Sequence, residues 1–279
     1  MTLNVLVVTK GHPYDHNALH ALFDDNKDIV STFVEQPAAQ VMLRPENVAP
    51  YDAVVFYDMW GIPTDATSSA SSEPPADYVK SIEALLESGK GIVLLNHALV
   101  QWPTWHLWRE ISGTTFRLTQ GEVDGRTVPG SGYRGGAGEP HRNAVHRLTP
   151  AQADHPVNRG LEGGFEIVDE LYLRTPLAAN ADIVPLLKSD YPFARANFNP
   201  PPLAPKNEQA AWDHGDGDNT IVWAKRTRNS PVVASEAGDG PLAYANPHFR
   251  RLLDNAIKWV ASKDAREWAK GGANAGMAG

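Results

Sequence analysis

Polar side chains that could act as acids, bases or metal ligands follow three apolar strands predicted from the sequence. These segments are Lys10–His16, Asp58–Gly61 and Asn96–Leu99. In an open α/β sheet, ligands bind at the carboxyl ends of the strands. We therefore expect the three segments to meet at one edge of the sheet and to line one pocket.

His97 is the strongest single candidate among these residues. It follows an apolar strand directly and precedes a helix, where a sharp turn can expose one side chain to a cleft. An imidazole in that place can serve as a base or a metal ligand but is rarely a nucleophile. The alternative is a histidine that makes structural hydrogen bonds only.

Two further histidines lie in the segment after the first strand. His16 stands just before a predicted helix, so it is either a second functional imidazole or a helix cap. His12 is followed by Pro13, which indicates a turn, and no other feature favours a functional role for it.

Other candidates have equally plain structural alternatives. Asp58 is a carboxylate at a strand end, although Asp in such turns often bonds its own backbone. Asp169 and Glu170 are adjacent carboxylates, an arrangement that is more often solvated than catalytic. Three tryptophans recur at intervals of three residues and indicate core packing or, alternatively, an aromatic wall for a sugar: Trp102, Trp105 and Trp108.

The elements that would position these residues alternate along the chain. Apolar runs predict strands at 3–8, 29–34, 53–57 and 92–95, and helical spacing of apolar residues predicts helices after the first and third of them. This alternation is typical of βαβ units, so we expect a three-layer, doubly wound α/β fold with a mostly parallel sheet. We expect one domain over residues 1–263 and a flexible tail over residues 264–279.

The glycine-rich segment from Gly121 to Gly138 is too long for a simple connection. We expect it to cover the carboxyl ends of the strands as a lid, or to contact a second subunit. Residues Gly130–Gly135 match a dinucleotide-binding pattern, but no strand precedes them and no helix follows, so no nucleotide cofactor is expected.

Composition excludes several classes of function. The chain has 279 residues, a net charge of -8 and no clustered basic patch, which argues against nucleic acid and anionic membranes as partners. It contains no Cys, which excludes disulfides and cysteine nucleophiles. No apolar run approaches the ~20 residues of a membrane span, and no signal peptide is recognisable, so a cytoplasmic location is expected.

Several motifs, taken in their order along the chain, resemble the ThuA-like, trehalose-utilisation family. They cover about residues 3 to 261 and comprise Pro13–His16, Leu94–Ala98, Gly113–Thr115, Asp154–Val157 with Gly160–Leu161, Asp169–Tyr172, Asn246–Pro247 and Asn255–Trp259. The resemblance implies a flavodoxin-like, class I glutamine amidotransferase-like fold without amidotransferase chemistry. Asp239 stands where this family usually has His.

The resemblance also implies a role in metabolism of disaccharides or oxidised sugars, and metal binding in several members. We expect His97, His16, Glu170 and Asp239 to be catalytic. Zinc, manganese or iron would be held by His16, His97 and Glu170, since two imidazoles and a carboxylate suit these metals better than calcium. Candidate substrate-binding residues are Asp58, Trp60, Asn96, Trp102 and Tyr172.

Two functions remain open at this point. The chain is either an enzyme acting on a small carbohydrate or a non-catalytic carbohydrate-binding or regulatory protein that retains the pocket. A fold alone does not decide between them. The discriminating feature is whether the histidines and a carboxylate converge. The sequence leaves the substrate, the metal and an assembly into homo-oligomers undetermined.

Overall fold

The computed structural model describes residues 2–62, 73–135, 142–178, 182–201 and 203–271. Its centre is a sheet of nine described strands in the order β2-β1-β3-β4-β13-β12-β11-β8-β9. The first five are parallel, namely β2 (Ile29–Glu35), β1 (Leu3–Thr9), β3 (Ala53–Phe56), β4 (Gly91–Leu95) and β13 (Ser230–Ser235). This is the flavodoxin-like strand order, so the expected α/β fold is confirmed.

The second half of the sheet is antiparallel throughout. It consists of β12 (Thr220–Thr227), β11 (Ile183–Ser189), β8 (Ala144–Pro150) and β9 (Phe165–Asp169). Only Arg228 and Asn229 separate β12 from β13. Because a two-residue connection can join only antiparallel strands, this hairpin fixes the change of direction.

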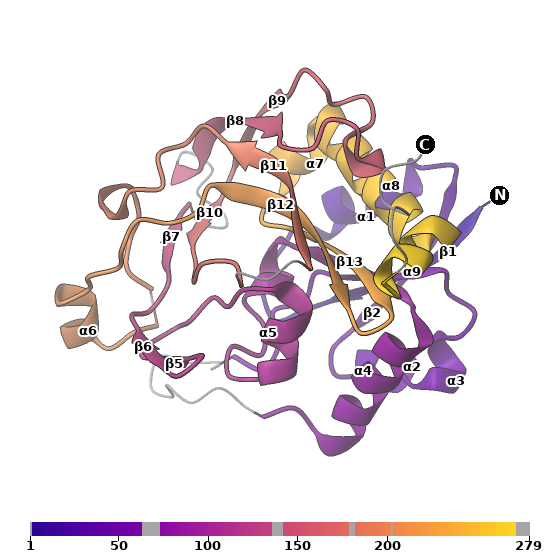
Figure 1. Ribbon diagram of the computed structural model, residues 1–279, viewed down its shortest axis with the longest axis horizontal. Coiled ribbons are helices and arrows are strands. Elements are labelled where there is room, and N and C mark those ends of the chain that lie inside the picture. The colour runs from indigo at the N-terminus through magenta and orange to yellow at the C-terminus, as the bar shows by residue number, and fades with distance from the viewer. Residues whose placement is uncertain (1, 63–72, 136–141, 179–181, 202, 272–279) are drawn as a thin grey trace.

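Helices cover both faces of the sheet, as Figure 1 shows. One face carries α1 (His16–Asp24), α7 (Pro241–Ala245), α8 (Pro247–Ala261) and α9 (Lys263–Ala269). The other carries α2 (Ala39–Met42), α3 (Pro45–Val48), α4 (Ala76–Ser88) and α5 (His106–Ser112). Helix α6 (Lys206–Ala210) lies apart from the sheet. Short 3-10 turns are η1 (Asn96–Leu99), η3 (Pro156–Asn158) and η4 (Arg195–Asn197).

The inner parallel strands β1, β3, β4 and β13 are buried on both sides, which explains their largely apolar sequence, whereas the edge strand β2 exposes Val30. In β1, Val5 and Val7 pack into the core under α1 and α8, whereas Leu6 and Val8 pack into the core under α4 and α5. Successive side chains of a strand point to opposite faces, so one strand contributes to two cores. The three-layer architecture follows from this alternation.

The glycine-rich segment is more ordered than its composition predicts. It forms a hairpin of β5 (Gly121–Val123) and β6 (Arg126–Val128), and then β7 (Gly132–Arg134). Strand β7 pairs with β10 (Leu171–Leu173), in the register Tyr133 to Tyr172. Residues 136–141 of the segment lie outside the described residues. Strand β7 is thereby joined to β10, whose Tyr172 contacts Asn96 at the carboxyl end of β4, and the lid over the site stays a prediction.

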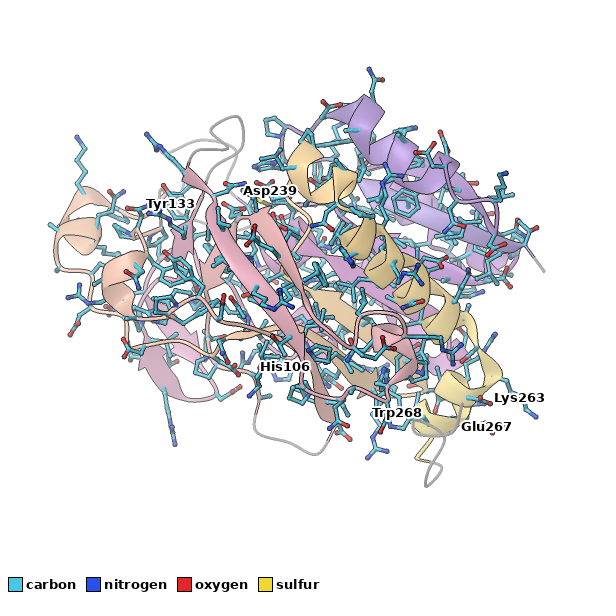
Figure 2. All side chains as sticks on the ribbon, turned by 90° about the horizontal axis from the view of Figure 1, so that it is seen from above. His106, Tyr133, Asp239, Lys263, Glu267 and Trp268 are labelled. Carbon is cyan, nitrogen blue, oxygen red and sulfur yellow. The ribbon has the colours of Figure 1, made fainter. Side chains whose placement is uncertain are left out.

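The expectation of a flexible tail from residue 264 is wrong for residues 264–269, which belong to α9. Ser262 caps this helix by accepting a hydrogen bond from the Ala265 N–H at 3.1 Å. Ala265 and Ala269 are buried, and Figure 2 shows Lys263, Glu267 and Trp268 of α9 at the opposite end of the molecule from Tyr133. Residues 272–279 lie outside the described residues. Within the described part of the chain, no helix has the length and apolar character required to cross a membrane.

Candidate functional site

His97 stands in a sharp turn at the carboxyl end of β4. Asn96 has a φ of 42°, in the left-handed region that Asn tolerates better than most residues, and η1 begins there. The Asn96 side-chain amide donates to the Glu236 carbonyl oxygen at 2.6 Å, which fixes the turn against the segment after β13. His97 is consequently buried, with 2% of its surface exposed.

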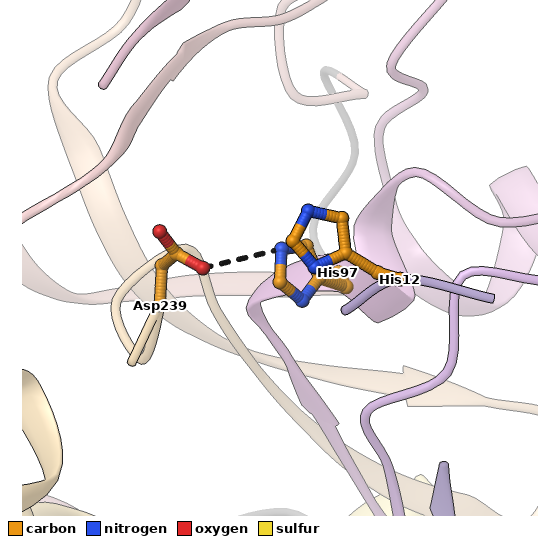
Figure 3. Close-up of side chains that lie close together, drawn as sticks. All are labelled: His12, His97 and Asp239. Carbon is orange, nitrogen blue, oxygen red and sulfur yellow. Dashed lines mark ion pairs between the residues drawn. The ribbon is translucent and has the colours of Figure 1, made fainter. Parts of the chain in front are cut away.

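His12 reaches the same place from the end of β1. Lys10 and Gly11 have φ values of 101° and 89°, so the chain reverses sharply directly after the strand. A Cβ at Gly11 would lie 2.1 Å from the Met59 carbonyl oxygen, which leaves room for glycine only. The turn places the His12 ring on the His97 ring, with centroids 3.8 Å apart and an interplanar angle of 28° (Figure 3).

Asp239 completes the group from the segment between β13 and α7. Gly238 and Gly240 flank it, and their positive φ values of 123° and 102° determine the backbone path of this segment. Asp239 Oδ1 lies 3.3 Å from His97 Nε2, the contact drawn as a dashed line in Figure 3. One ligand atom from each of His12, His97 and Asp239 lies within 4.8 Å of the other two.

Burial sets the protonation states of this group. It lowers the pKa of His97 well below its ordinary value, with a further contribution from His12, and it also lowers the pKa of His12. Burial raises the pKa of Asp239 to about 6. At pH 7 the group is therefore two neutral imidazoles and a carboxylate that is mostly ionised, which is the state required of metal ligands.

The imidazole nitrogens have unused hydrogen-bonding capacity. His97 Nδ1, His97 Nε2 and His12 Nδ1 are buried and have no hydrogen-bond partner among the described residues. Asp239 Oδ1 lies 3.3 Å from His97 Nε2 but lacks hydrogen-bond alignment, so it leaves that nitrogen without a partner. Buried polar atoms without partners are costly. A bound cation, or a substrate hydroxyl, would satisfy them.

A second polar group lies beside the first. The Tyr172 hydroxyl is 3.0 Å from Glu170 Oε2 and 3.1 Å from Asn96 Oδ1. Burial, and then the charge of Asp239, raise the pKa of Glu170 well above its ordinary value. A hydroxyl has one proton, so both contacts form together only when Glu170 carries a proton of its own. Glu170 and Tyr172 are thus arranged to hold a transferable proton next to Asn96.

The structure does not bring His16 into this group, which corrects the predicted metal ligands. Asp15 accepts the Ala18 N–H at 2.9 Å and acts as the N-cap, so α1 begins at His16 and turns its side chain outward. His16 is exposed, and its ring stacks on Tyr14 at 4.2 Å. Glu170 is likewise engaged with Tyr172 instead of joining the metal-competent group.

Three predicted substrate-binding residues also lie elsewhere. Asp58 has no exposed surface and accepts hydrogen bonds from the side-chain amides of Gln36 at 2.8 Å and Gln101 at 3.0 Å. Trp102 is buried against Tyr78, and Trp60 packs against the same core. The tryptophans at three-residue intervals are therefore mainly core, the first of the two readings of their spacing. Asn96 and Tyr172 do lie beside His97 and Glu170.

The sequence signal for His12 is Gly11. A glycine two residues after a buried strand indicates a backbone reversal, and a reversal carries the next side chain back over the strand end. Pro13 indicated the turn correctly, but a turn at this place brings His12 into the site instead of removing it.

The fold and the site together define an α/β protein of flavodoxin-like strand order with a histidine–carboxylate centre at the carboxyl ends of its parallel strands. Residues 4–260 match the model of the ThuA family, described as trehalose utilisation, and the chain belongs to this family. Its membership supports a carbohydrate-related role. No curated protein is significantly similar to the chain in sequence.

Solved structures with the same fold include two described as putative ThuA-like proteins. The one from Parabacteroides merdae is 17% identical with a TM-score of 0.63, and the match covers 94% of this chain and 91% of that one. The one from Bacteroides uniformis is 17% identical with a TM-score of 0.62, covering 94% and 92%. A cytoplasmic protein from Salmonella typhimurium is 11% identical with a TM-score of 0.57, covering 94% and 100%. At these identities the likeness concerns the fold.

Proposed function

We propose that this protein is an enzyme of small-carbohydrate metabolism that acts on a disaccharide or an oxidised keto sugar. The observation that carries the proposal is the convergence of His12, His97 and Asp239 from three separate strand ends. Family membership supports carbohydrate as the substrate class. A cytoplasmic location, and a free sugar as the partner, go with this proposal.

His12, His97 and Asp239 would hold a divalent metal ion. Neutral imidazoles and one carboxylate suit zinc, manganese or iron better than calcium, which prefers oxygen ligands. The unpartnered nitrogens of both rings fit this assignment. A metal bound there would supply Lewis-acid polarisation of a sugar carbonyl or hydroxyl.

The remaining residues of the site suit proton transfer. Glu170, kept protonated by burial and by the charge of Asp239, can donate a proton to a departing or developing sugar oxygen. Tyr172 links Glu170 to Asn96 and orients it. Asp239 and His97 can accept a proton when no metal occupies them, so acid–base chemistry by these residues does not require a metal.

The experiment is a product screen by NMR. The purified chain, loaded with Zn²⁺, Mn²⁺ or Fe²⁺, is incubated with trehalose, other disaccharides and their keto derivatives. We expect turnover of at least one sugar by the wild type, and loss of it by more than about 100-fold in His97→Ala and Asp239→Asn. Asp213→Asn, which changes an exposed carboxylate, is the matched control.

Two outcomes would reject the enzyme. If no sugar in the screen is converted but one of them binds, the chain is a non-catalytic carbohydrate-binding protein. If a sugar is converted equally well by the wild type and His97→Ala, the chemistry takes place elsewhere in the molecule.

A further inference from the structure

Asp169, at the end of β9, has no exposed surface and accepts three backbone hydrogen bonds. Its Oδ2 accepts the Gly238 N–H at 2.6 Å. Its Oδ1 accepts the N–H groups of Asp239 at 3.0 Å and Glu170 at 2.9 Å. Two of these donors belong to a segment about 70 residues away along the chain.

Asp169 contacts a segment that has little regular secondary structure of its own. It joins β13 to α7 and contains Gly238 and Gly240 in the left-handed region. Because glycines give the backbone more conformational freedom, such a segment adopts a single conformation only when contacts hold it. The Asp169 carboxylate supplies them at Asp239 itself, the residue that contacts His97.

We propose that Asp169 is a positioning residue that holds Asp239 against His97 and Glu170 beside Tyr172. This assignment rests on the proposed function, in which these two carboxyl groups do chemistry. Asp169 itself touches no substrate, because it is fully buried and both of its oxygens accept backbone N–H groups.

A neighbouring buried ion pair contacts the same segment at a different residue. Arg174 Nε lies 2.9 Å from Glu236 Oε1, and this pair anchors the start of the same segment. Glu236 lies three residues before Asp239, so this pair does not contact Asp239. Asp169 fixes the amides of Gly238 and Asp239 directly, so it controls the direction of the Asp239 side chain more closely.

The test is Asp169→Asn in the full chain. Asn has the same size, but its NH₂ group replaces one acceptor and faces a backbone N–H group, so one clamp contact is lost. With Co²⁺ as the probe, we expect the dissociation constant to rise about 10- to 100-fold, the usual effect of changing a group that orients a ligand. We also expect an altered visible spectrum and a shifted His97 ring resonance.

Asp190→Asn is the matched control. Asp190 accepts the Arg147 N–H at 2.8 Å, a comparable carboxylate–backbone contact that belongs to β8 and the end of β11. We expect this variant to bind Co²⁺ as the wild type does. Equal Co²⁺ affinity, spectrum and His97 resonance in a folded Asp169→Asn would overturn the proposal.

Two further measurements separate the possible failures. If the wild type binds no Co²⁺, the metal part of the proposed function is wrong, and the His97 resonance alone decides whether Asp169 positions Asp239. If Asp169→Asn does not fold, hydrogen exchange of the wild type decides. The Gly238 and Asp239 amides must then exchange as slowly as strand amides, and exchange at the rate of an open loop would overturn the clamp.

Discussion

His12 and His16 are four residues apart, yet they have different surroundings. His12 stacks on the buried His97, whereas His16 is exposed on the first turn of α1. Reading residue types predicted an imidazole pair after the first and fourth strands. Gly11 indicates that the chain reverses after the first strand, but the direction in which the reversal turns His12 depends on the backbone angles of Lys10 and Gly11, which residue types alone do not specify.

We predict that His12→Ala weakens metal binding and turnover by more than about 100-fold, since it removes one of three ligands. His16→Ala is the matched control and should change both by less than about threefold. Metal content after gel filtration, and initial rates on the sugar found by the screen, measure these effects. If His16→Ala instead causes the larger loss of metal binding and turnover, His16 is the ligand and the assignment of His12 is wrong.

The pH dependence of metal binding follows from Asp239. Because its pKa is raised to about 6, it is ionised above that pH and protonated below it. A protonated carboxyl does not bind metal, so Co²⁺ affinity should fall about tenfold for each pH unit below 6. Burial lowers the pKa values of His12 and His97, so their protons compete only at lower pH. Co²⁺ titrations from pH 8 to pH 5 measure this slope. If Asp239→Asn keeps the same slope, protonation of Asp239 is not its cause.

At the scale of elements, the sequence predicts most strands of both halves of the sheet, but not the antiparallel pairing of the second half. The runs at 3–8, 53–57 and 92–95 belong to inner strands that are largely buried on both faces and therefore read as continuous apolar sequence. The run at 29–34 forms the edge strand β2, in which Val30 is exposed. Strands β8 and β9 alternate, with Val145 exposed between Ala144 and His146, so they carry a weaker signal. The pairing of β7 with β10 joins segments that are distant along the chain, so no local sequence pattern predicts it.

The junction between β1 and β3 gives a prediction at this scale. Gly11→Ala should displace the turn, because its Cβ would meet the Met59 carbonyl oxygen and its φ is unfavourable. We expect a loss of about 2–4 kcal/mol in the free energy of unfolding, together with loss of metal binding. Gly125→Ala is the matched control, since its φ is also positive but a Cβ there would meet no atom within 4 Å. Chemical denaturation compares the two, and equal losses would show that sterics at Met59 do not hold the turn.

At the scale of the molecule, buried histidines outside the site contribute to the pH dependence of stability. Burial lowers the pKa values of His146 and His155 to about 4. The folded state then binds fewer protons than the unfolded chain between pH 6.5 and pH 4, so their contribution to stability is present above pH 6.5 and is lost as the pH falls. His155 Nδ1 also accepts the Val157 N–H, which requires the neutral ring.

We predict that His155→Asn flattens this dependence. Asn can keep the cap at η3 but has no proton to bind. For a shift from 6.5 to about 4, the wild type should lose about 2 kcal/mol of stability between pH 7 and pH 5 through this residue alone, and the variant should lose correspondingly less. Urea unfolding at the two pH values measures the difference. The exposed His106→Asn serves as control, and an unchanged pH dependence in His155→Asn would contradict the prediction.

We propose above all that His12, His97 and Asp239 form one metal-binding centre. X-ray absorption at the zinc edge of the Zn²⁺-loaded chain tests it most directly. We predict one zinc per chain with two imidazole nitrogens at about 2.0–2.1 Å and a carboxylate oxygen, and the loss of one imidazole in His12→Ala. A chain that retains no zinc, or a His12→Ala spectrum identical to that of the wild type, would contradict it.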